Sequence, residues 1–232
     1  MLSNPDWDAV PSLRHGFLDR DDSGVAGDGD WTRALRAAGV ALPALTVRQV
    51  HGTRVMVAEP GAEPPEADGI ATRERGLALG VVTADCVPVL LLARSSSVIA
   101  AVHAGWRGAA AGVLEAALAR LRAAFGVEPP SVEALLGPAI GPCCYRVGNE
   151  VKSAFTARTG TITAPAWKPA GDRLLLDLRA AARLLLQAAG VRSVAAVGPC
   201  TCCTPAFASY RRDGASAGRQ LSFIGWEGAR AE

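Results

Sequence analysis

The sequence lacks any hydrophobic run long enough to cross a membrane, and it lacks a strong bias of charge. Its longest apolar stretches, residues 76–84 and 87–93, are interrupted by Asp85 and fall short of the ~20 residues that a spanning helix needs. Residues 1–22 show no apolar core of a secretory signal, so we expect none. The formal net charge is +2, and like charges do not cluster in long runs. We therefore expect neither nucleic acid nor a membrane as a partner.

Histidine is also scarce, with three residues, whereas six cysteines are present. Cysteines without an export signal indicate a reducing compartment, where thiols serve as metal ligands, catalysts or small buried side chains. We therefore expect a cytoplasmic protein. Half of the 232 residues are hydrophobic and 20% are charged, which permits a substantial core and argues against disorder over most of the chain.

Short runs rich in Val, Leu, Ile and Ala, bounded by Gly, Pro or Asp, predict strands. The predicted strands cover residues 45–50, 54–58, 69–72, 77–83, 87–92, 98–102, 132–136, 194–197 and 220–224. Helical spacing marks residues 31–38, 109–125 and 177–189 instead. Strands with a few helices in no strict alternation favour one α+β domain over residues 1–232, with a layered α/β/α-type fold and a mixed sheet. The Pro- and Gly-rich segments 59–66 and 163–171 are predicted to be surface loops.

Three side chains that can bind metal occupy similar positions along the chain. His51 and His103 each end a strand-like run, and Cys86 follows the run 81–85. Two imidazoles and a thiolate suit zinc, with copper as a competitor, and three protein ligands leave a fourth position open, as in catalytic sites. The residues alone leave another interpretation open, because histidines at strand ends are more often structural and a lone buried cysteine is usually inert.

Asp85 is the acidic residue nearest to Cys86 in the sequence. It is a candidate to orient a ligand histidine or to accept a proton, and capping the turn between two strands is an equally good interpretation. In segment 103–108, two glycines before a predicted helix would let backbone N–H groups face an anion, and Arg107 adds positive charge.

The other five cysteines fall in two clusters, Cys143 with Cys144, and Cys200 with Cys202 and Cys203. A four-cysteine zinc site is conceivable. Adjacent cysteines, however, are poorly placed to reach one metal, and a zinc knuckle normally has two residues between its thiols. We therefore expect buried or cleft-lining thiols rather than metal ligands.

Six segments together resemble the laccase-domain (YfiH) family of multicopper polyphenol oxidases, also called purine nucleoside phosphorylases and peptidoglycan editing factors. They are residues 49–52, 67–69, 83–86, 102–108, 137–145 and 207–214, and they follow the family's order. The resemblance implies that His51, Cys86 and His103 match the family's metal ligands and that zinc is the metal. Three histidines are too few for a multicopper cluster.

The resemblance also implies phosphorolysis of adenosine, inosine, guanosine and methylthioadenosine, together with deamination of adenosine. The partners are then a nucleoside and phosphate, with Arg48, Arg107 and Arg211 as candidate contacts to phosphate or ribose and Asp85 as a candidate proton acceptor. The alternatives are a hydrolase that edits a nucleotide-linked peptidoglycan precursor, a copper-dependent polyphenol oxidase, and a metal- or thiol-bearing binding protein without turnover.

Overall fold

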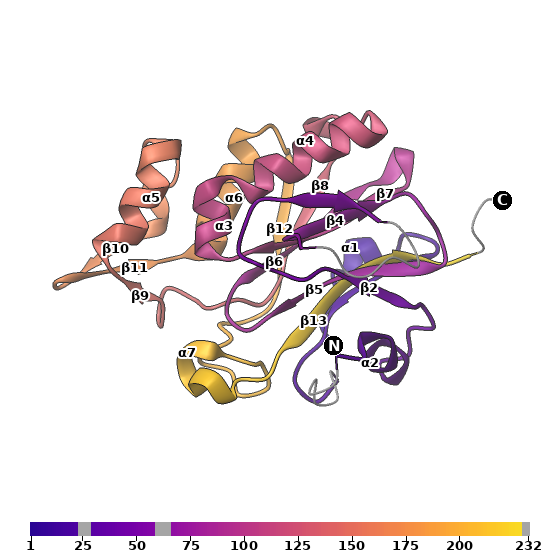
Figure 1. Ribbon diagram of the computed structural model, residues 1–232, viewed down its shortest axis with the longest axis horizontal. Coiled ribbons are helices and arrows are strands. Elements are labelled where there is room, and N and C mark those ends of the chain that lie inside the picture. Colours follow the sequence, from indigo (N-terminus) through magenta and orange to yellow (C-terminus); the bar gives the residue numbers. More distant parts are fainter. Residues whose placement is uncertain (23–28, 59–65, 229–232) are drawn as a thin grey trace.

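A computed structural model describes residues 1–22, 29–58 and 66–228 (Figure 1). Its α-helices are α1 (Pro5–Asp8), α2 (Trp31–Ala37), α3 (Trp106–Ala111), α4 (Val113–Phe125), α5 (Asn149–Thr159), α6 (Leu178–Ala188) and α7 (Tyr210–Asp213). Its strands are β1 (Leu13–Phe17), β2 (Ala44–Thr46), β3 (Val55–Val57), β4 (Gly69–Thr72), β5 (Leu77–Thr83), β6 (Val87–Ala93), β7 (Val98–Ala104), β8 (Glu133–Leu136), β9 (Arg146–Val147), β10 (Trp167–Ala170), β11 (Arg173–Leu176), β12 (Ser193–Ala196) and β13 (Gln220–Trp226).

The larger sheet has six strands in the order β12-β8-β6-β7-β4-β3. Its outermost pairs, β12 with β8 and β3 with β4, are parallel, and the pairs between them are antiparallel. Strands β6 and β7 are buried at every residue, so they need cover on both faces. Helices α3, α4 and α6 cover one face, as Figure 1 shows above the sheet.

A second, four-stranded sheet in the order β1-β13-β5-β2 covers the other face. Leu90 and Ile99 of the larger sheet share one buried core with Leu79 and Ile224 of the smaller sheet. Helix α2 packs on the outer side of the smaller sheet. The predicted α+β class is confirmed and both sheets are mixed. The predicted central sheet, however, is divided between two packed sheets, which gives the layers helix, sheet, sheet, helix.

The predicted helix 109–125 begins earlier, at Trp106, and is interrupted. Gly112 has φ +105°, a left-handed backbone that ends α3 and starts α4. The predicted helix 177–189 is observed as α6, and the side chain of Asp177 accepts the Ala180 N–H at its start, as an N-cap does.

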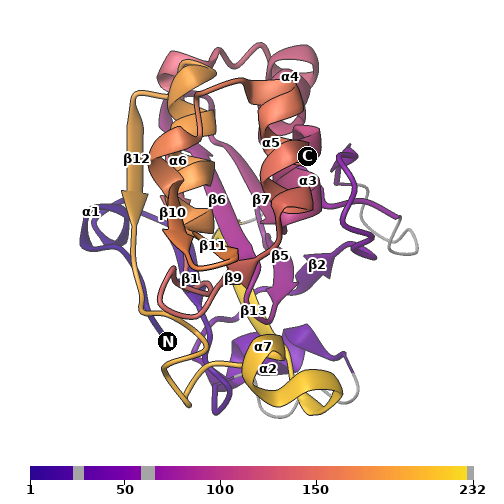
Figure 2. The same cartoon turned by 90° about the vertical axis from the view of Figure 1, so that its left-hand side faces the viewer.

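The prediction of a surface loop at 163–171 is wrong. This segment contains β10, the edge strand of a small sheet in the order β10-β11-β9 that lies beside the lower ends of α5 and α6 (Figure 2). Pro169 has no N–H to donate to a neighbouring strand. It is tolerated in β10 because an edge strand has a neighbour on one side only. Of the other predicted loop, 59–66, only Glu66 lies within the described residues, and it forms a β-bridge with Arg48.

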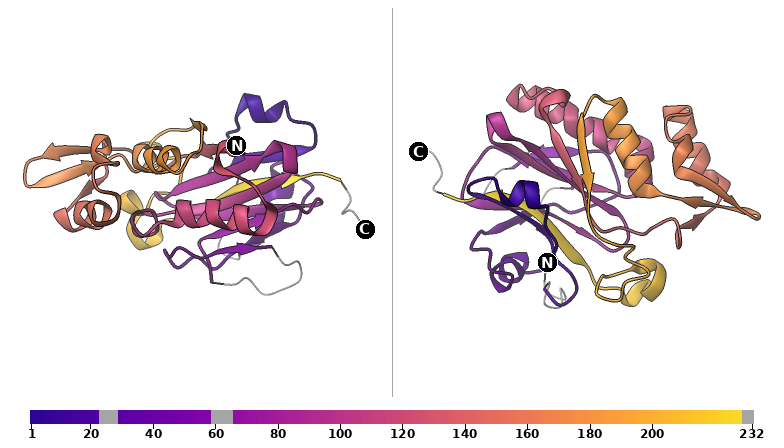
Figure 3. Two further views of the ribbon diagram at one scale, coloured as in Figure 1. Left: turned by 90° about the horizontal axis from the view of Figure 1, so that it is seen from above. Right: turned by 180° about the vertical axis from the view of Figure 1, so that it is seen from behind.

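The sequence patterns did not predict α1 and β1 near the N-terminus. Seen from behind, α1 lies on the same side of the molecule as the edge strand β12 (Figure 3). The indole N–H of Trp7 in α1 donates to Glu133 of β8 at 2.9 Å, which fixes the helix to the larger sheet. None of the helices in the described ranges has the length and apolar character needed to span a bilayer.

His15 lies on β1, and its side chain is buried with 4% of its surface exposed. Its Nε2 accepts the backbone N–H of Asn4 at 2.9 Å, which requires an unprotonated nitrogen. Burial lowers the pKa of His15 below its ordinary value of 6.5, against a weaker opposite effect of Asp8. The folded protein therefore holds this imidazole neutral.

His15 should make the protein less stable in mild acid. Below pH 6.5, His15 is protonated in the unfolded chain, whereas its lowered pKa keeps it neutral in the folded protein. The free energy of unfolding therefore falls as the pH drops. Glutamine does not titrate. We expect the stability difference between the wild type and His15→Gln, measured by urea unfolding, to be largest at neutral pH and to shrink toward about pH 5. A difference that stays constant with pH would contradict this account.

Candidate metal centre and active site

A cavity of about 540 Å³ opens beside the turn between β5 and β6, within the size range of small-molecule sites. Five separate parts of the chain form its wall. The lining residues are Gln49, His51, Val82, Thr83, Ala84, Asp85, Cys86, His103, Trp106, Arg107, Ile140, Tyr145, Tyr210, Arg211 and Arg219.

His51, Cys86 and His103 meet in the wall of this cavity. Their potential ligand atoms all lie within 4.8 Å of one another, so the group could hold a metal ion. His103 is the next-to-last residue of β7, and Cys86 stands in the turn between β5 and β6. His51 lies in the loop beyond β2, so the expectation that all three residues end strands holds only in part.

Gly105 leaves space for this group. A Cβ atom at position 105 would lie 3.0 Å from both Cys86 Sγ and His51 Cδ2, closer than ordinary contacts allow. The glycine before α3 therefore has a steric reason: it lets the side chains of Cys86 and His51 approach the backbone.

The carboxylate of Asp68 holds both histidines in place. Its Oδ1 lies 2.8 Å from His103 Nδ1 and accepts the backbone N–H of His51 at 2.9 Å, while Oδ2 accepts that of Gly52 at 2.6 Å. These bonds secure His51 at φ 61°, a left-handed conformation that is unfavourable for residues other than glycine. With Nδ1 engaged, His103 keeps Nε2 for a metal.

The electrostatics of the group favour a thiolate. Loss of solvent opposes ionisation of Cys86, but hydrogen bonds with His103 and His51 lower the pKa of its thiol to about 7. Burial likewise disfavours a charged His103, yet Asp68 and Cys86 raise the pKa of this imidazole to about 9. The thiolate is the form that binds metal, and a cation can replace the proton of the imidazole.

Asp85 lies in the turn between β5 and β6 and bonds to two other segments of the chain. Its Oδ1 accepts the hydroxyl of Thr201 at 2.7 Å, and its Oδ2 accepts the N–H of Arg211 at 2.6 Å. Of the roles left open for Asp85, these bonds support the one at the turn between the two strands, because the carboxylate that contacts His103 belongs to Asp68. Asp85 instead ties the β5–β6 turn to the start of α7. The motif 67–69, which carries Asp68, was the signal that could have pointed to it.

The structure brings two of the three predicted arginines to the cavity. Arg107 stacks over the ring of Trp106 at 4.4 Å, and Arg211 lies 5.2 Å from the ring centre of Tyr145. Arg48 is absent from the cavity wall and pairs with Glu66 at 2.6 Å, with both side chains well exposed. Arg219 also lies in the wall and adds a third guanidinium group to it.

Comparisons with known proteins agree with the motifs. Residues 12–227 match the family described as "Multi-copper polyphenol oxidoreductase laccase". The chain is 41% identical over 181 residues to the purine nucleoside phosphorylase YfiH of Escherichia coli, covering 77% of this chain and 72% of that protein. It is 37% identical over 221 residues to a purine nucleoside phosphorylase of Xylella fastidiosa, covering 89% and 83%.

The fold has solved counterparts as well. The crystal structure of a Neisseria meningitidis protein of the DUF152 family matches with a TM-score of 0.82 and 34% identity, over 96% of this chain and 98% of that one. YlmD from Geobacillus stearothermophilus matches with a TM-score of 0.83 and 29% identity, over 97% and 94%. The chain therefore belongs to the laccase-domain family, several of whose curated members are named purine nucleoside phosphorylases.

Proposed function

We propose that this protein is a zinc-dependent purine nucleoside phosphorylase that also deaminates adenosine. The observation that carries the proposal is the position of the His51–Cys86–His103 group in the wall of a cavity that also holds Arg107 and Arg211. The names of the relatives supply the substrate class. The substrates implied by the family are adenosine, inosine, guanosine and methylthioadenosine, with phosphate as the second reactant.

The residues of the centre fit a zinc ion. They offer two imidazole nitrogens and a thiolate, Gly105 leaves room beside them, and Asp68 orients His103. Copper accepts the same donor types. The third histidine, His15, however, lies on β1, where its Nε2 accepts the N–H of Asn4, and it cannot extend the group into a multicopper cluster. When bound, zinc would supply Lewis acidity at the edge of the cavity and lower the pKa of water there.

The rest of the wall can hold a nucleoside and phosphate. Arg107 and Arg211 present guanidinium groups suited to bidentate contacts with phosphate, which would be held against ribose C1′ for phosphorolysis. Trp106 and Tyr145 offer apolar ring surface for the purine. The buried hydroxyl of Thr83 has no partner among the described residues, so a bound base or sugar would gain a hydrogen bond there.

We also propose that the enzyme works in the cytoplasm. None of the six cysteines is in a disulfide, which fits a reducing compartment.

Product analysis of the purified protein tests the reaction. Release of adenine from adenosine should require phosphate and yield ribose 1-phosphate, because phosphate is then the nucleophile. Formation of inosine should proceed without phosphate. His51→Ala should lose both activities, because one metal centre serves both. Release of adenine at full rate without phosphate would favour a hydrolase, and either activity in metal-free His51→Ala would contradict the shared centre.

The arginines allow a finer test with a matched control. Arg107→Ala should raise the KM for phosphate by roughly tenfold or more, since a hydrogen bond to a charged group contributes about 1.5–3 kcal/mol. Deamination, which uses no phosphate, should change much less. Arg48→Ala removes the same charge outside the cavity and should leave both rates near those of the wild type. Equal losses of both activities in Arg107→Ala would argue against a phosphate contact.

The role of Asp68 is tested through metal affinity. Asp68→Asn keeps the size of the side chain but weakens the bonds to His103 and to the loop of His51, so zinc affinity should fall by roughly 10–100-fold. Competition with a chromophoric chelator measures this affinity, and circular dichroism checks the fold. Glu66→Gln, an exposed carboxylate change, is the control. Unchanged affinity in folded Asp68→Asn would show that the bond to His103 does not support the metal.

A further inference from the structure

A second group of possible metal ligands lies outside the cavity. The sulfur atoms of Cys143, Cys144, Cys200 and Cys203 all lie within 4.8 Å of one another. Cys203 Sγ lies 3.5 Å from that of Cys143 and 3.3 Å from that of Cys144. Cys143 and Cys203 are exposed, and none of the four lines the cavity. The sequence-based expectation of buried or cleft-lining thiols is therefore wrong.

We propose that these four cysteines form a closed structural zinc site, separate from the His51–Cys86–His103 centre. Zn–S bonds of about 2.3 Å in a tetrahedron place the sulfurs roughly 3.8 Å apart, close to the observed spacing. A disulfide needs sulfurs about 2.05 Å apart. An iron–sulfur cluster needs them further apart than a single ion does, because its own iron and sulfide atoms fill the centre.

The backbone around the sulfurs has the features of a thiolate site. Cys200 and Cys203 have two residues between them, the spacing of a zinc knuckle. The N–H of Gly141 donates to Cys200 Sγ at 3.1 Å, and the backbone N–H of Cys203 bonds to the same sulfur. Such bonds orient a ligand thiolate and spread its charge.

A tight turn explains how two adjacent cysteines can share one metal. The N–H groups of Cys144 and Tyr145 both donate to the carbonyl of Gly141 at 3.0 Å, so the chain folds back over Cys143. A Cβ atom at position 141 would lie 3.1 Å from the Cβ of Cys200, so glycine is needed for the two segments to approach. Both sulfurs then face Cys203.

A bound cation would stabilise the four thiolates. Four thiolates in so small a space repel one another strongly, whereas a divalent ion removes the repulsion and binds each thiolate in exchange for its proton. Four protein ligands leave no position for a substrate, so the site stabilises structure rather than performing chemistry.

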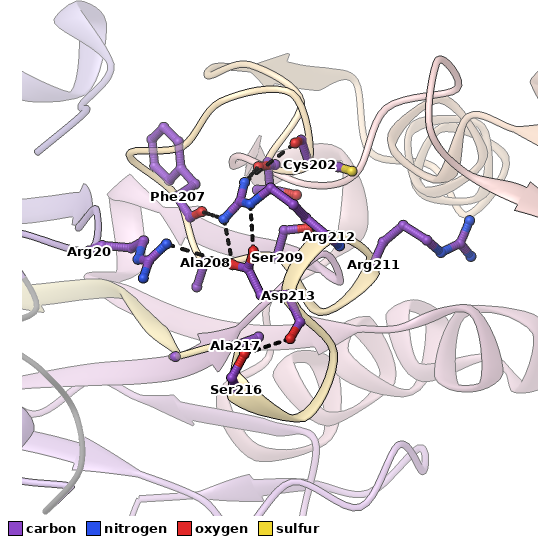
Figure 4. A network of polar contacts seen from close by, with 12 residues as sticks. Arg20, Cys202, Phe207, Ala208, Ser209, Arg211, Arg212, Asp213, Ser216 and Ala217 are labelled. Carbon is purple, nitrogen blue, oxygen red and sulfur yellow. Dashed lines mark hydrogen bonds and ion pairs between the residues drawn. The ribbon is translucent and has the colours of Figure 1, made fainter.

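The proposed site joins the loop that carries Tyr145 of the cavity wall to the loop that leads into α7, where Arg211 of the wall lies. Tyr145 follows Cys144, and the guanidinium of Arg211 donates to the carbonyl of Cys144 at 2.9 Å. In the other loop, Arg212 donates to the carbonyls of Thr201 and Phe207 at 2.9 and 2.8 Å (Figure 4). Figure 4 shows Arg211 extending away from this network. Zinc would therefore fix the wall that carries Tyr145 and Arg211.

Zinc content of the full chain, measured by plasma mass spectrometry, tests the proposal. We expect about two equivalents in the wild type and about one in the double variant Cys200→Ser/Cys203→Ser. His51→Ala should also retain about one equivalent, held by the four thiols. Cys202→Ser is the matched control, because Cys202 lies in the same loop but outside the group, and it should retain both ions. Complete loss of zinc in folded His51→Ala would overturn the second site.

Alkylation of the wild type, mapped by mass spectrometry, keeps the test valid if the double variant does not fold. In zinc-loaded protein the four thiols should be protected although two of them are exposed, and removal of zinc by a chelator should make them reactive. Rapid labelling of Cys143 and Cys203 in zinc-loaded protein would contradict the proposal. So would a disulfide between Cys203 and either Cys143 or Cys144 in metal-replete protein kept under reducing conditions.

Discussion

The candidate site depends on the hydrogen bonds that the buried carboxylate of Asp68 makes with His103 and with the backbone of His51 and Gly52. A fully buried charge is costly unless its acceptor positions are filled. Burial favours the protonated acid, but hydrogen bonds with His103 and with the backbone N–H groups of Gly52 and His51 nevertheless lower the pKa of Asp68. The same bonds join the loop of His51 to strand β7. One carboxylate thus has its charge compensated, orients the ring of His103 and fixes the backbone of His51.

The division into two sheets explains where this site lies. Strand β5 belongs to the smaller sheet and β6 to the larger, so the turn between them carries the chain from one sheet to the other. Asp85, at φ 88°, makes this turn and is held there by Thr201 and Arg211. Cys86 therefore emerges where the two sheets meet, beside His103 at the end of β7. Residues 82–86, at the end of β5 and in this turn, form part of the cavity wall.

Local patterns predicted those elements whose own residues determine them. Strands β4 and β5 occupy the predicted ranges because their apolar runs have clear ends, and α6 starts at its capping Asp177. The two-sheet arrangement was not predicted, because it rests on pairing of β13 with β1 and β5, which lie far away in the sequence. The family resemblance pointed to His51, Cys86 and His103, which the structure brings together. The role of Asp68 was not predicted. Its partners His51 and His103 are 17 and 35 residues away in the sequence, so no local pattern joins them to it.

The wrong predictions for Arg48 and for the adjacent cysteines have one physical cause. Whether the side chains of two neighbouring residues point the same way depends on the conformation of the backbone between them. Neighbours in extended chain point to opposite sides. Gln49 turns inward and exchanges hydrogen bonds with Val82, while Arg48 beside it turns outward to Glu66 and misses the cavity. In a tight turn, neighbouring side chains can point to the same side, and the turn at residues 141–145 brings the sulfurs of Cys143 and Cys144 close together. Whether neighbouring residues act together therefore depends on the local backbone. The hydrogen bonds to the Gly141 carbonyl set it for the two cysteines, and the bonds of Gln49 with Val82 set it for the segment of Arg48.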